Sequence, residues 1–228
     1  MRPATGVRCH FLAVPATADY GVADLQTVVQ GGTTCAARAR KVAEGEGGGE
    51  VTRIVVLNGV GSVGKSSLAR ALQARSRLPL LHVAMDGFLE MLPEALRDHP
   101  SGISYVRTPI GVEVRVGPAG ARLLAGMLEA VAALAWAGCD LVFDTVMDRE
   151  ATIICRARLT AFDTAHVGLV APLTVIEARE VQRGDRLIGL ARAQFGRVHV
   201  GIDDDLTLDM TVLAPETAAQ AICERFGL

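Results

Sequence analysis

Continuously apolar segments alternate with amphipathic ones along most of this chain. Strands that are covered on both faces appear as unbroken apolar runs, whereas amphipathic helices repeat apolar residues about once per turn. The predicted strands are residues 53–58, 80–85, 140–146, 166–171 and 208–213. The predicted helices are residues 65–75, 88–97, 118–137, 150–162, 173–183 and 215–226. This alternation predicts an α/β fold in which helices cover both faces of a five-stranded parallel sheet.

Two regions depart from this alternation. Residues 1–50 are rich in Gly, Ala and Thr and end in a glycine-rich run, so we expect a flexible or poorly ordered N-terminal extension. The folded domain should therefore span residues 51–228. Residues 99–117 contain several turn dipeptides, and the alternating stretch 111–117 suggests a short hairpin arm that borders a substrate pocket.

Residues 59–66, Gly-Val-Gly-Ser-Val-Gly-Lys-Ser, match the phosphate-loop pattern G-x-x-x-x-G-K-[ST] at every fixed position. The pattern lies between a predicted buried strand and a predicted helix, which is the context that it requires. Glycines let backbone N–H groups approach phosphate oxygens, and the helix N-terminus faces the same charge. We therefore predict an ATP site formed by Gly59, Val60, Gly61, Ser62, Val63, Gly64, Lys65, Ser66 and Ser67.

Two side chains of this loop and one later carboxylate are candidates for contacts with phosphate and Mg²⁺. Lys65 should reach the β- and γ-phosphates, and Ser66 should offer its hydroxyl to Mg²⁺. Asp144 ends the third predicted strand, where phosphate-loop proteins place a second carboxylate on the magnesium side. Asp144 could instead cap the next helix or help to hold substrate, and the sequence leaves these roles open.

Asp86 follows the second predicted strand, at the edge of the sheet where ligands bind in folds of this class. A carboxylate there can accept the proton of a hydroxyl group that attacks the γ-phosphate. Aspartate is also favoured as a helix N-cap, and the two roles are compatible. Asp86 is therefore a candidate general base.

Three arginines, Arg179, Arg183 and Arg186, follow the fourth predicted strand. Arg179 and Arg183 share one face of a predicted helix, and Gly184 permits a bend before Arg186. Such a segment can close over a nucleotide, with Arg179 binding the nucleotide, and can place guanidinium groups on the transferring phosphoryl group. The alternative is a solvated helix with surface ion pairs, because acidic residues such as Glu180 are interleaved.

The bulk composition excludes several classes of protein. The net charge is −2 and aromatic residues make up 4% of the chain, so neither a basic stripe nor a base-stacking platform indicates a nucleic-acid partner. Five scattered cysteines without a C-x-x-C pair argue against a zinc site and favour a reducing cytosol. No apolar run approaches the ~18 residues of a membrane span. We expect a cytoplasmic protein without a membrane partner, and a homo-oligomer is compatible with the sequence.

In combination, the motifs resemble those of the chloramphenicol 3-O-phosphotransferase family of small phosphate-loop kinases. The matching segments are residues 55–67, 85–93, 141–146, 177–186, 193–194 with His199, and 205–209, and they occur in family order. Departures from the family pattern are Gly87 after Asp86 and Thr145 after Asp144. Residues 95–117, which would help to line the acceptor pocket, match poorly.

The resemblance implies a three-layer P-loop kinase fold with an arginine-bearing lid. It implies transfer of the γ-phosphate of ATP, with Mg²⁺, to a hydroxyl group of an antibiotic such as chloramphenicol, which would give self-resistance. It also implies that Asp86 is the general base, that Lys65 and Ser66 hold phosphate and Mg²⁺, and that Arg183 and Arg186 are lid arginines.

Two other functions remain open at this stage. The same chemistry could act on a nucleoside, a nucleoside antibiotic, a sugar or another metabolite, because changes in pocket-lining residues alter the acceptor without touching the phosphate machinery. A nucleotide-dependent switch would belong to a different class of protein. The chain lacks an Asn-Lys-x-Asp guanine-reading motif, which disfavours a GTPase switch.

Overall fold

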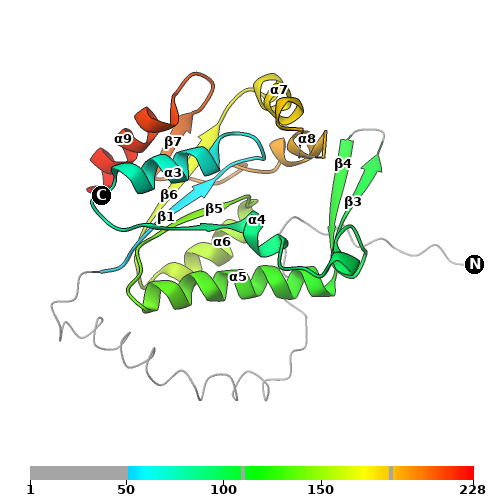
Figure 1. Ribbon diagram of the computed structural model, residues 1–228, viewed down its shortest axis with the longest axis horizontal. Helices are drawn as coiled ribbons and strands as arrows, with labels where there is room; N and C mark the ends of the chain where they lie inside the picture. Colours follow the sequence, from blue (N-terminus) through cyan, green and yellow to red (C-terminus); the bar gives the residue numbers. More distant parts are fainter. Residues whose placement is uncertain (1–50, 109–110, 185–186) are drawn as a thin grey trace, which may run out of the picture.

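The computed structural model of the protein describes residues 51–108, 111–184 and 187–228. The predicted N-terminal extension lies outside these residues. The described chain forms three layers, with a sheet between two sets of helices (Figure 1). A separate hairpin stands at the end of the sheet toward which its strands point (Figure 1).

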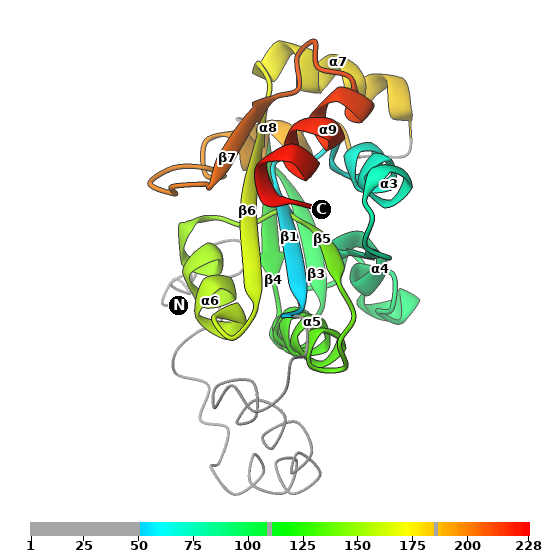
Figure 2. The ribbon, with the colours of Figure 1, turned by 90° about the vertical axis from the view of Figure 1, so that its left-hand side faces the viewer.

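The central sheet has five strands in the order β2-β5-β1-β6-β7, and all four pairings are parallel. This confirms the predicted α/β fold, and Figure 2 shows β1 between β5 and β6. The strands are β1 (Arg53–Asn58), β2 (Leu81–Ala84), β5 (Leu141–Thr145), β6 (Asp163–Val170) and β7 (Leu206–Asp209). Because Leu57 pairs with Asp144 and Asn58 with Thr145, the phosphate loop begins beside the end of β5.

Helices α3 (Lys65–Arg75) and α9 (Pro215–Phe226) cover one face of the sheet, and α5 (Pro118–Trp136) and α6 (Arg149–Leu159) cover the other. The side chains of β1 alternate between these layers, as a strand period of two requires. Val55 and Leu57 pack in the core beneath α3 and α9, whereas Ile54 and Val56 pack in the core beneath α5 and α6. The continuous apolar run that predicted β1 therefore reflects a strand that is buried on both sides.

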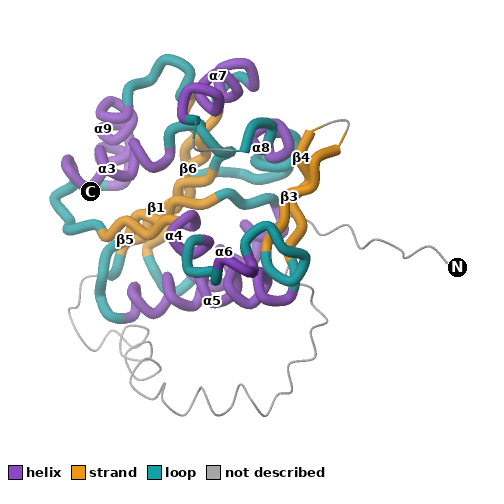
Figure 3. Tube along the Cα trace, turned by 45° about the vertical axis from the view of Figure 1, so that its right-hand side comes forward, coloured by secondary structure: helices purple, strands orange, loops and turns teal. Residues whose placement is uncertain are grey.

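The predicted hairpin is confirmed. Strands β3 (Ile103–Thr108) and β4 (Gly111–Val116) pair antiparallel and form a two-stranded sheet of their own. The hairpin stands beside α8 (Leu190–Phe195), which contacts β4 (Figure 3). A small apolar cluster around Ile103 and Val114 joins the hairpin to the rest of the domain.

The predicted helix at 88–97 is wrong in both position and length. Helix α4 covers Met85–Leu89, and a separate 3-10 turn covers Glu94–Leu96. Pro93 lies between them, and proline both lacks the N–H of a helical hydrogen bond and disfavours helical geometry in the residue before it. The apolar spacing that suggested one helix therefore belongs to two short pieces.

Two further elements differ from expectation. The last strand is Leu206–Asp209 rather than residues 208–213, because the chain turns after Asp209 and α9 begins only at Pro215. Helix α8 has six residues and was not predicted. So short a segment shows too few turns for a helical repeat to stand out in the sequence.

Helix α5 corrects the statement that no segment approaches the length of a membrane span. It has 19 residues with a mean hydropathy of 1.3, which is long and apolar enough by length and composition alone. Leu124, Met127 and Val131 are buried against the sheet, as in the core helix of an α/β domain. Within the described residues, α5 is the sole helix that meets this criterion.

Candidate active site

The phosphate loop connects β1 to α3, as the sequence predicts. Gly59 stands where the loop leaves the strand, and a Cβ atom there would lie 2.8 Å from the carbonyl oxygen of Leu169, so the position requires glycine. Gly64 precedes α3 with a φ of 114°, in the left-handed region that favours glycine. The glycines of the motif are therefore explained by close backbone approach and by a positive φ.

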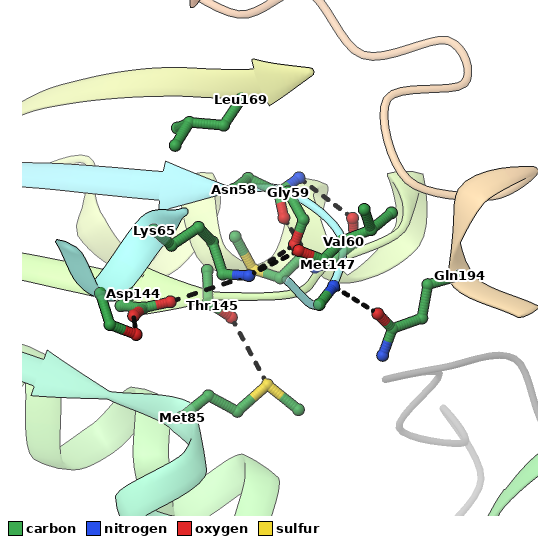
Figure 4. Close-up of polar contacts among 12 residues, drawn as sticks. Asn58, Gly59, Val60, Lys65, Met85, Asp144, Thr145, Met147, Leu169 and Gln194 are labelled. Atoms are coloured by element: carbon green, nitrogen blue, oxygen red, sulfur yellow. Dashed lines mark hydrogen bonds and ion pairs between the residues drawn. The ribbon is translucent and has the colours of Figure 1, made fainter. Parts of the chain in front are cut away.

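Lys65 is folded back onto the start of its own loop. Its Nζ donates to the carbonyl oxygens of Gly59, at 2.9 Å, and Val60, at 3.0 Å (Figure 4). Lys65 is 9% exposed, so its charge is held close to the loop rather than in bulk solvent. An anion in the loop would compete with these carbonyl groups for the ammonium group.

A cavity of about 490 Å³, here called the phosphate-loop cavity, lies above the loop. Eight of the ten predicted nucleotide-binding residues line it, namely Gly61, Ser62, Val63, Gly64, Lys65, Ser66, Ser67 and Arg179. Gly59 and Val60 do not line it, and their carbonyl groups hold Lys65 instead. Ser62 has a positive φ of 62°, and its buried Oγ has no hydrogen-bond partner in the described part of the chain. A phosphate oxygen is a suitable partner for such a hydroxyl group.

Ser66 and Asp144 meet at the edge of this cavity. The Oγ of Ser66 donates to Oδ2 of Asp144 at 2.7 Å, and Nζ of Lys65 lies 3.9 Å from Oδ1 of the same carboxylate. Burial by itself would raise the pKa of Asp144, but the neighbouring His82, Lys65 and Ser66 outweigh burial and hold that pKa below its ordinary value. Asp144 is therefore an anion next to a hydroxyl group.

This pair fits the requirements of Mg²⁺. Magnesium prefers hard oxygen ligands, and nucleotide sites usually supply only one or two from the protein and leave the rest to phosphates and water. The oxygens of Ser66 and Asp144 satisfy that description. Among the alternatives for Asp144, capping of the next helix is excluded, because Asp148 caps α6 by accepting from the N–H of Ala151.

Asp86 lies in the first turn of α4, directly after β2, and Ala84 is the N-cap of that helix. The N-cap role considered for Asp86 is therefore wrong. Asp86 lines the phosphate-loop cavity and also a second cavity of about 370 Å³, here called the α4 cavity. Leu89, Tyr105 and Leu190 line both cavities as well, so the two spaces adjoin at Asp86.

The arginines of the predicted lid occupy different places. Arg179 lines the phosphate-loop cavity, and its guanidinium group donates to the carbonyl oxygens of Val63, at 3.4 Å, and Met210, at 2.8 Å. Arg179 thereby connects α7 (Leu173–Arg183) to the phosphate loop and to the segment after β7. Arg183 ends α7 and lines the same cavity. Arg186 lies outside the described residues.

Sequence reasoning missed the role of Glu180. This carboxylate is 3% exposed and accepts from the backbone N–H groups of Gly189, at 2.8 Å, and Ala191, at 2.9 Å. The expectation of a surface ion pair is therefore wrong for Glu180, which binds the first turn of α8 to α7. One signal in the sequence was the spacing of Glu180, which follows the apolar residue Ile176 by four positions and so shares its face of a helix. Both residues are buried on α7.

Gln194 was also given no role by the sequence. It belongs to α8, is 7% exposed, and lines the phosphate-loop cavity. Its Oε1 accepts from the backbone N–H of Gly61 at 2.7 Å (Figure 4). A contact between residues so far apart in the chain leaves no periodic trace, and the one signal in the sequence was that residues 193–194 belong to the segments that match the family.

The sequence of residues 52–227 matches the family described as chloramphenicol phosphotransferase-like protein. The chain belongs to this family. The resemblance inferred from the motifs is thus confirmed, and the chain is a member of a kinase family. A search of curated proteins finds no match.

Solved structures with the same fold are small kinases. A sugar kinase from Janibacter sp. HTCC2649 is 18% identical, with a TM-score of 0.54 over 78% of this chain and 95% of that one. The Mycobacterium tuberculosis APS kinase in complex with AMPPNP and APS is 16% identical, with a TM-score of 0.57 over 78% and 99%. A gluconokinase from Sinorhizobium meliloti 1021 is 17% identical, with a TM-score of 0.50 over 77% and 90%. At these identities the comparison shows the fold, which is that of P-loop kinases.

Proposed function

We propose that this chloramphenicol phosphotransferase-like protein transfers the γ-phosphate of ATP to a hydroxyl group of a small molecule, with an antibiotic such as chloramphenicol as the acceptor. One observation carries the proposal. Asp86 stands where the phosphate-loop cavity adjoins the α4 cavity, so one carboxylate borders both the donor space and a second, adjacent space. A kinase requires this arrangement, because its general base must reach the acceptor hydroxyl next to the terminal phosphate.

The donor half of the reaction would use the phosphate loop. The backbone N–H groups of the loop and the Lys65 ammonium group would bind the β- and γ-phosphates. Arg183, which lines the same cavity, would stabilise charge on the transferring phosphoryl group. Ser66 and Asp144 would hold Mg²⁺, which would supply positive charge to the phosphates of the nucleotide.

The acceptor half would use the α4 cavity. Asp86 would take the proton of the acceptor hydroxyl as its oxygen forms a bond to the γ-phosphorus, and the bond from that phosphorus to the leaving oxygen of ADP breaks. The products are the phosphorylated acceptor and ADP. Because the reaction depends mainly on positioning and charge stabilisation, the two cavities must hold both substrates in line.

The lining of the α4 cavity supports an uncharged acceptor with an apolar body. Its apolar wall is formed by Leu89, Leu92, Ile103, Tyr105, Leu187 and Leu190. Among the described residues, the charged ones that line it are three carboxylates, Asp86, Glu90 and Asp98, and one cation, Arg97, whose guanidinium group donates to the carbonyl oxygens of Leu92 and Glu90. This excess of negative charge disfavours phosphorylated or sulfated acceptors.

The test is an acceptor panel incubated with ATP and Mg²⁺ and analysed by mass spectrometry for added phosphate. The panel contains chloramphenicol, a nucleoside, a neutral sugar and a phosphorylated sugar. Phosphate on chloramphenicol alone supports the proposal. Phosphate on the nucleoside or the neutral sugar would keep the proposed reaction and change only the identity of the acceptor. Binding of ATP without transfer to any member would favour the nucleotide-dependent switch.

The role of Asp86 is tested with Asp86→Asn. The asparagine cannot accept the proton, so we expect transfer to fall by about 10²–10⁴-fold while ATP affinity stays the same. Glu94→Gln is the matched control, because Glu94 is an exposed carboxylate in the nearby 3-10 turn and lines neither cavity. Transfer by Asp86→Asn at the rate of Glu94→Gln would show that Asp86 is not the base.

A further inference from the structure

The side-chain amide of Gln194 has a fixed orientation. The backbone N–H of Gly61 can only donate, so the atom that faces it at 2.7 Å must be the amide oxygen of Gln194. The NH₂ group therefore points away from the loop backbone, and Figure 4 shows the nitrogen of Gln194 turned away from that contact. Gln194 is 7% exposed, so its two N–H donors are directed into largely enclosed space.

Gln194 lines the phosphate-loop cavity together with Asp86 and Tyr105, and it also lines a cavity of about 580 Å³ beside the hairpin. Gln194 comes from α8, the helix whose first residue also lines the α4 cavity. A nucleotide that donates its terminal phosphate toward Asp86 places that phosphate in the same cavity that Gln194 lines.

Helix α8 is held at both ends, so the amide of Gln194 cannot easily withdraw. The carboxylate of Glu180 on α7 accepts from the N–H groups of Gly189 and Ala191 at the start of α8. The bond from Gln194 to Gly61 holds the other end of α8 to the phosphate loop. The helix also contacts β4 of the hairpin. A buried donor held in this way is pre-organised for a ligand, which lowers the cost of ordering it on binding.

We propose that Gln194 recognises the γ-phosphate of the bound nucleotide. Its amide oxygen stays on the N–H of Gly61, and its amide nitrogen donates to an oxygen of the terminal phosphate. This assignment rests on the proposed function for the orientation of ATP, since it places the γ-phosphate beside Asp86. ADP has no phosphate at that position, so Gln194 makes the site prefer ATP over ADP.

The proposal is tested by binding alone, with no acceptor present. Calorimetry on the full chain measures the affinities for ADP and for AMPPNP, the non-hydrolysable ATP analogue, with Mg²⁺. Gln194→Leu preserves the size of the side chain and removes the donor, so AMPPNP affinity should fall about tenfold, as expected for one hydrogen bond to a charged group. ADP affinity should change by less than about twofold, because Gln194 makes no contact with ADP phosphates.

A second variant protects the test against a simple loss of structure. Gln194→Glu keeps an oxygen acceptor for the N–H of Gly61 and places a negative charge where the γ-phosphate arrives. AMPPNP affinity should fall by more than in Gln194→Leu, while ADP binding is retained. Gln220→Leu is the matched control, because Gln220 is exposed on α9 and bonds only to Glu224 in the described structure. This control should bind both nucleotides as the unaltered protein does.

An AMPPNP-to-ADP affinity ratio that is unchanged in both Gln194 variants would overturn the proposal. The proposed function fails in a different experiment, the acceptor panel. A lowered ratio together with a panel that receives no phosphate would leave γ-phosphate recognition by Gln194 in place and remove the kinase assignment. An unchanged ratio together with a phosphorylated acceptor would remove γ-phosphate recognition by Gln194 and leave the kinase assignment in place.

Discussion

Replacement of Glu180 by glutamine tests whether α7 and α8 are joined as the structure shows. Both oxygens of this buried carboxylate accept backbone N–H groups, from Gly189 and from Ala191. Glutamine is almost the same size but has only one oxygen. Its NH₂ group would face one of the two backbone N–H groups, and two donors cannot pair with each other.

The expected loss follows from these two contacts. One charge-assisted hydrogen bond is removed, which is a loss of about 1.5–3 kcal/mol. The stranded N–H group is buried and adds a desolvation penalty, so we expect a total loss of about 2–4 kcal/mol in the free energy of unfolding. Because folded domains are stable by only about 5–15 kcal/mol, a change of this size is readily measured.

The assay is urea denaturation of the Glu180→Gln variant, followed by circular dichroism, with amide hydrogen exchange in α8 as a second measurement. Glu177→Gln is the matched control on the same helix. Glu177 pairs with Arg192 near the surface, and such exposed ion pairs contribute about 1 kcal/mol or less. A Glu180→Gln variant with the urea midpoint and the α8 exchange rates of Glu177→Gln would refute the reasoning.

Two further predictions concern the packing and the pH dependence of the sheet. Gly168→Ala should destabilise the fold by about 1–3 kcal/mol, because a Cβ atom there would lie 2.0 Å from Oδ2 of Asp204. Gly126→Ala in α5 should stabilise the fold by about 0.5–1 kcal/mol, because a Cβ atom there meets nothing within 4 Å. The urea midpoints of the two variants should therefore move in opposite directions. Burial, assisted by the charge of Arg156, lowers the pKa of His166 to about 4. In the unfolded chain, His166 takes up a proton at pH ~6.5. The contribution of neutral His166 to the free energy of unfolding is therefore complete above that pH and is lost as the pH falls toward 4. A His166→Gln variant should show a smaller fall in urea midpoint between pH 7 and 4, and an equal fall would contradict the assignment.

Local patterns explain why much of the donor site was predictable. The phosphate loop is a continuous run of eight residues with required spacing, and the alternating apolar segments define the sheet that holds it. Asp86 could be predicted as a site residue because it follows β2, and the ends of parallel strands lie at the edge of the sheet where ligands bind. For Asp144, the structure excluded only the role of helix cap. The register of β1 with β5 brings Asp144 beside Ser66, and Asp148 provides the cap that Asp144 might have supplied.

Long-range contacts explain what the sequence could not predict. The α4 cavity is assembled from α4, the β3–β4 hairpin and α8, which are short elements far apart in the chain. Glu180 and Gln194 both act through backbone N–H groups of other segments, and any residue type can provide a backbone N–H. Neither the partner nor the geometry of such a bond is written into a local pattern.

Local patterns were enough to predict the parallel sheet, most of its helices, the phosphate loop and membership in a kinase family. These features depend on the period of apolar residues and on required residue types at fixed spacing, which are local properties. The position of Asp86 between two adjoining cavities, the burial of Glu180 and the bond from Gly61 to Gln194 became visible only in the folded chain. The reason is physical, because these relations arise from the packing of distant segments around the end of the sheet.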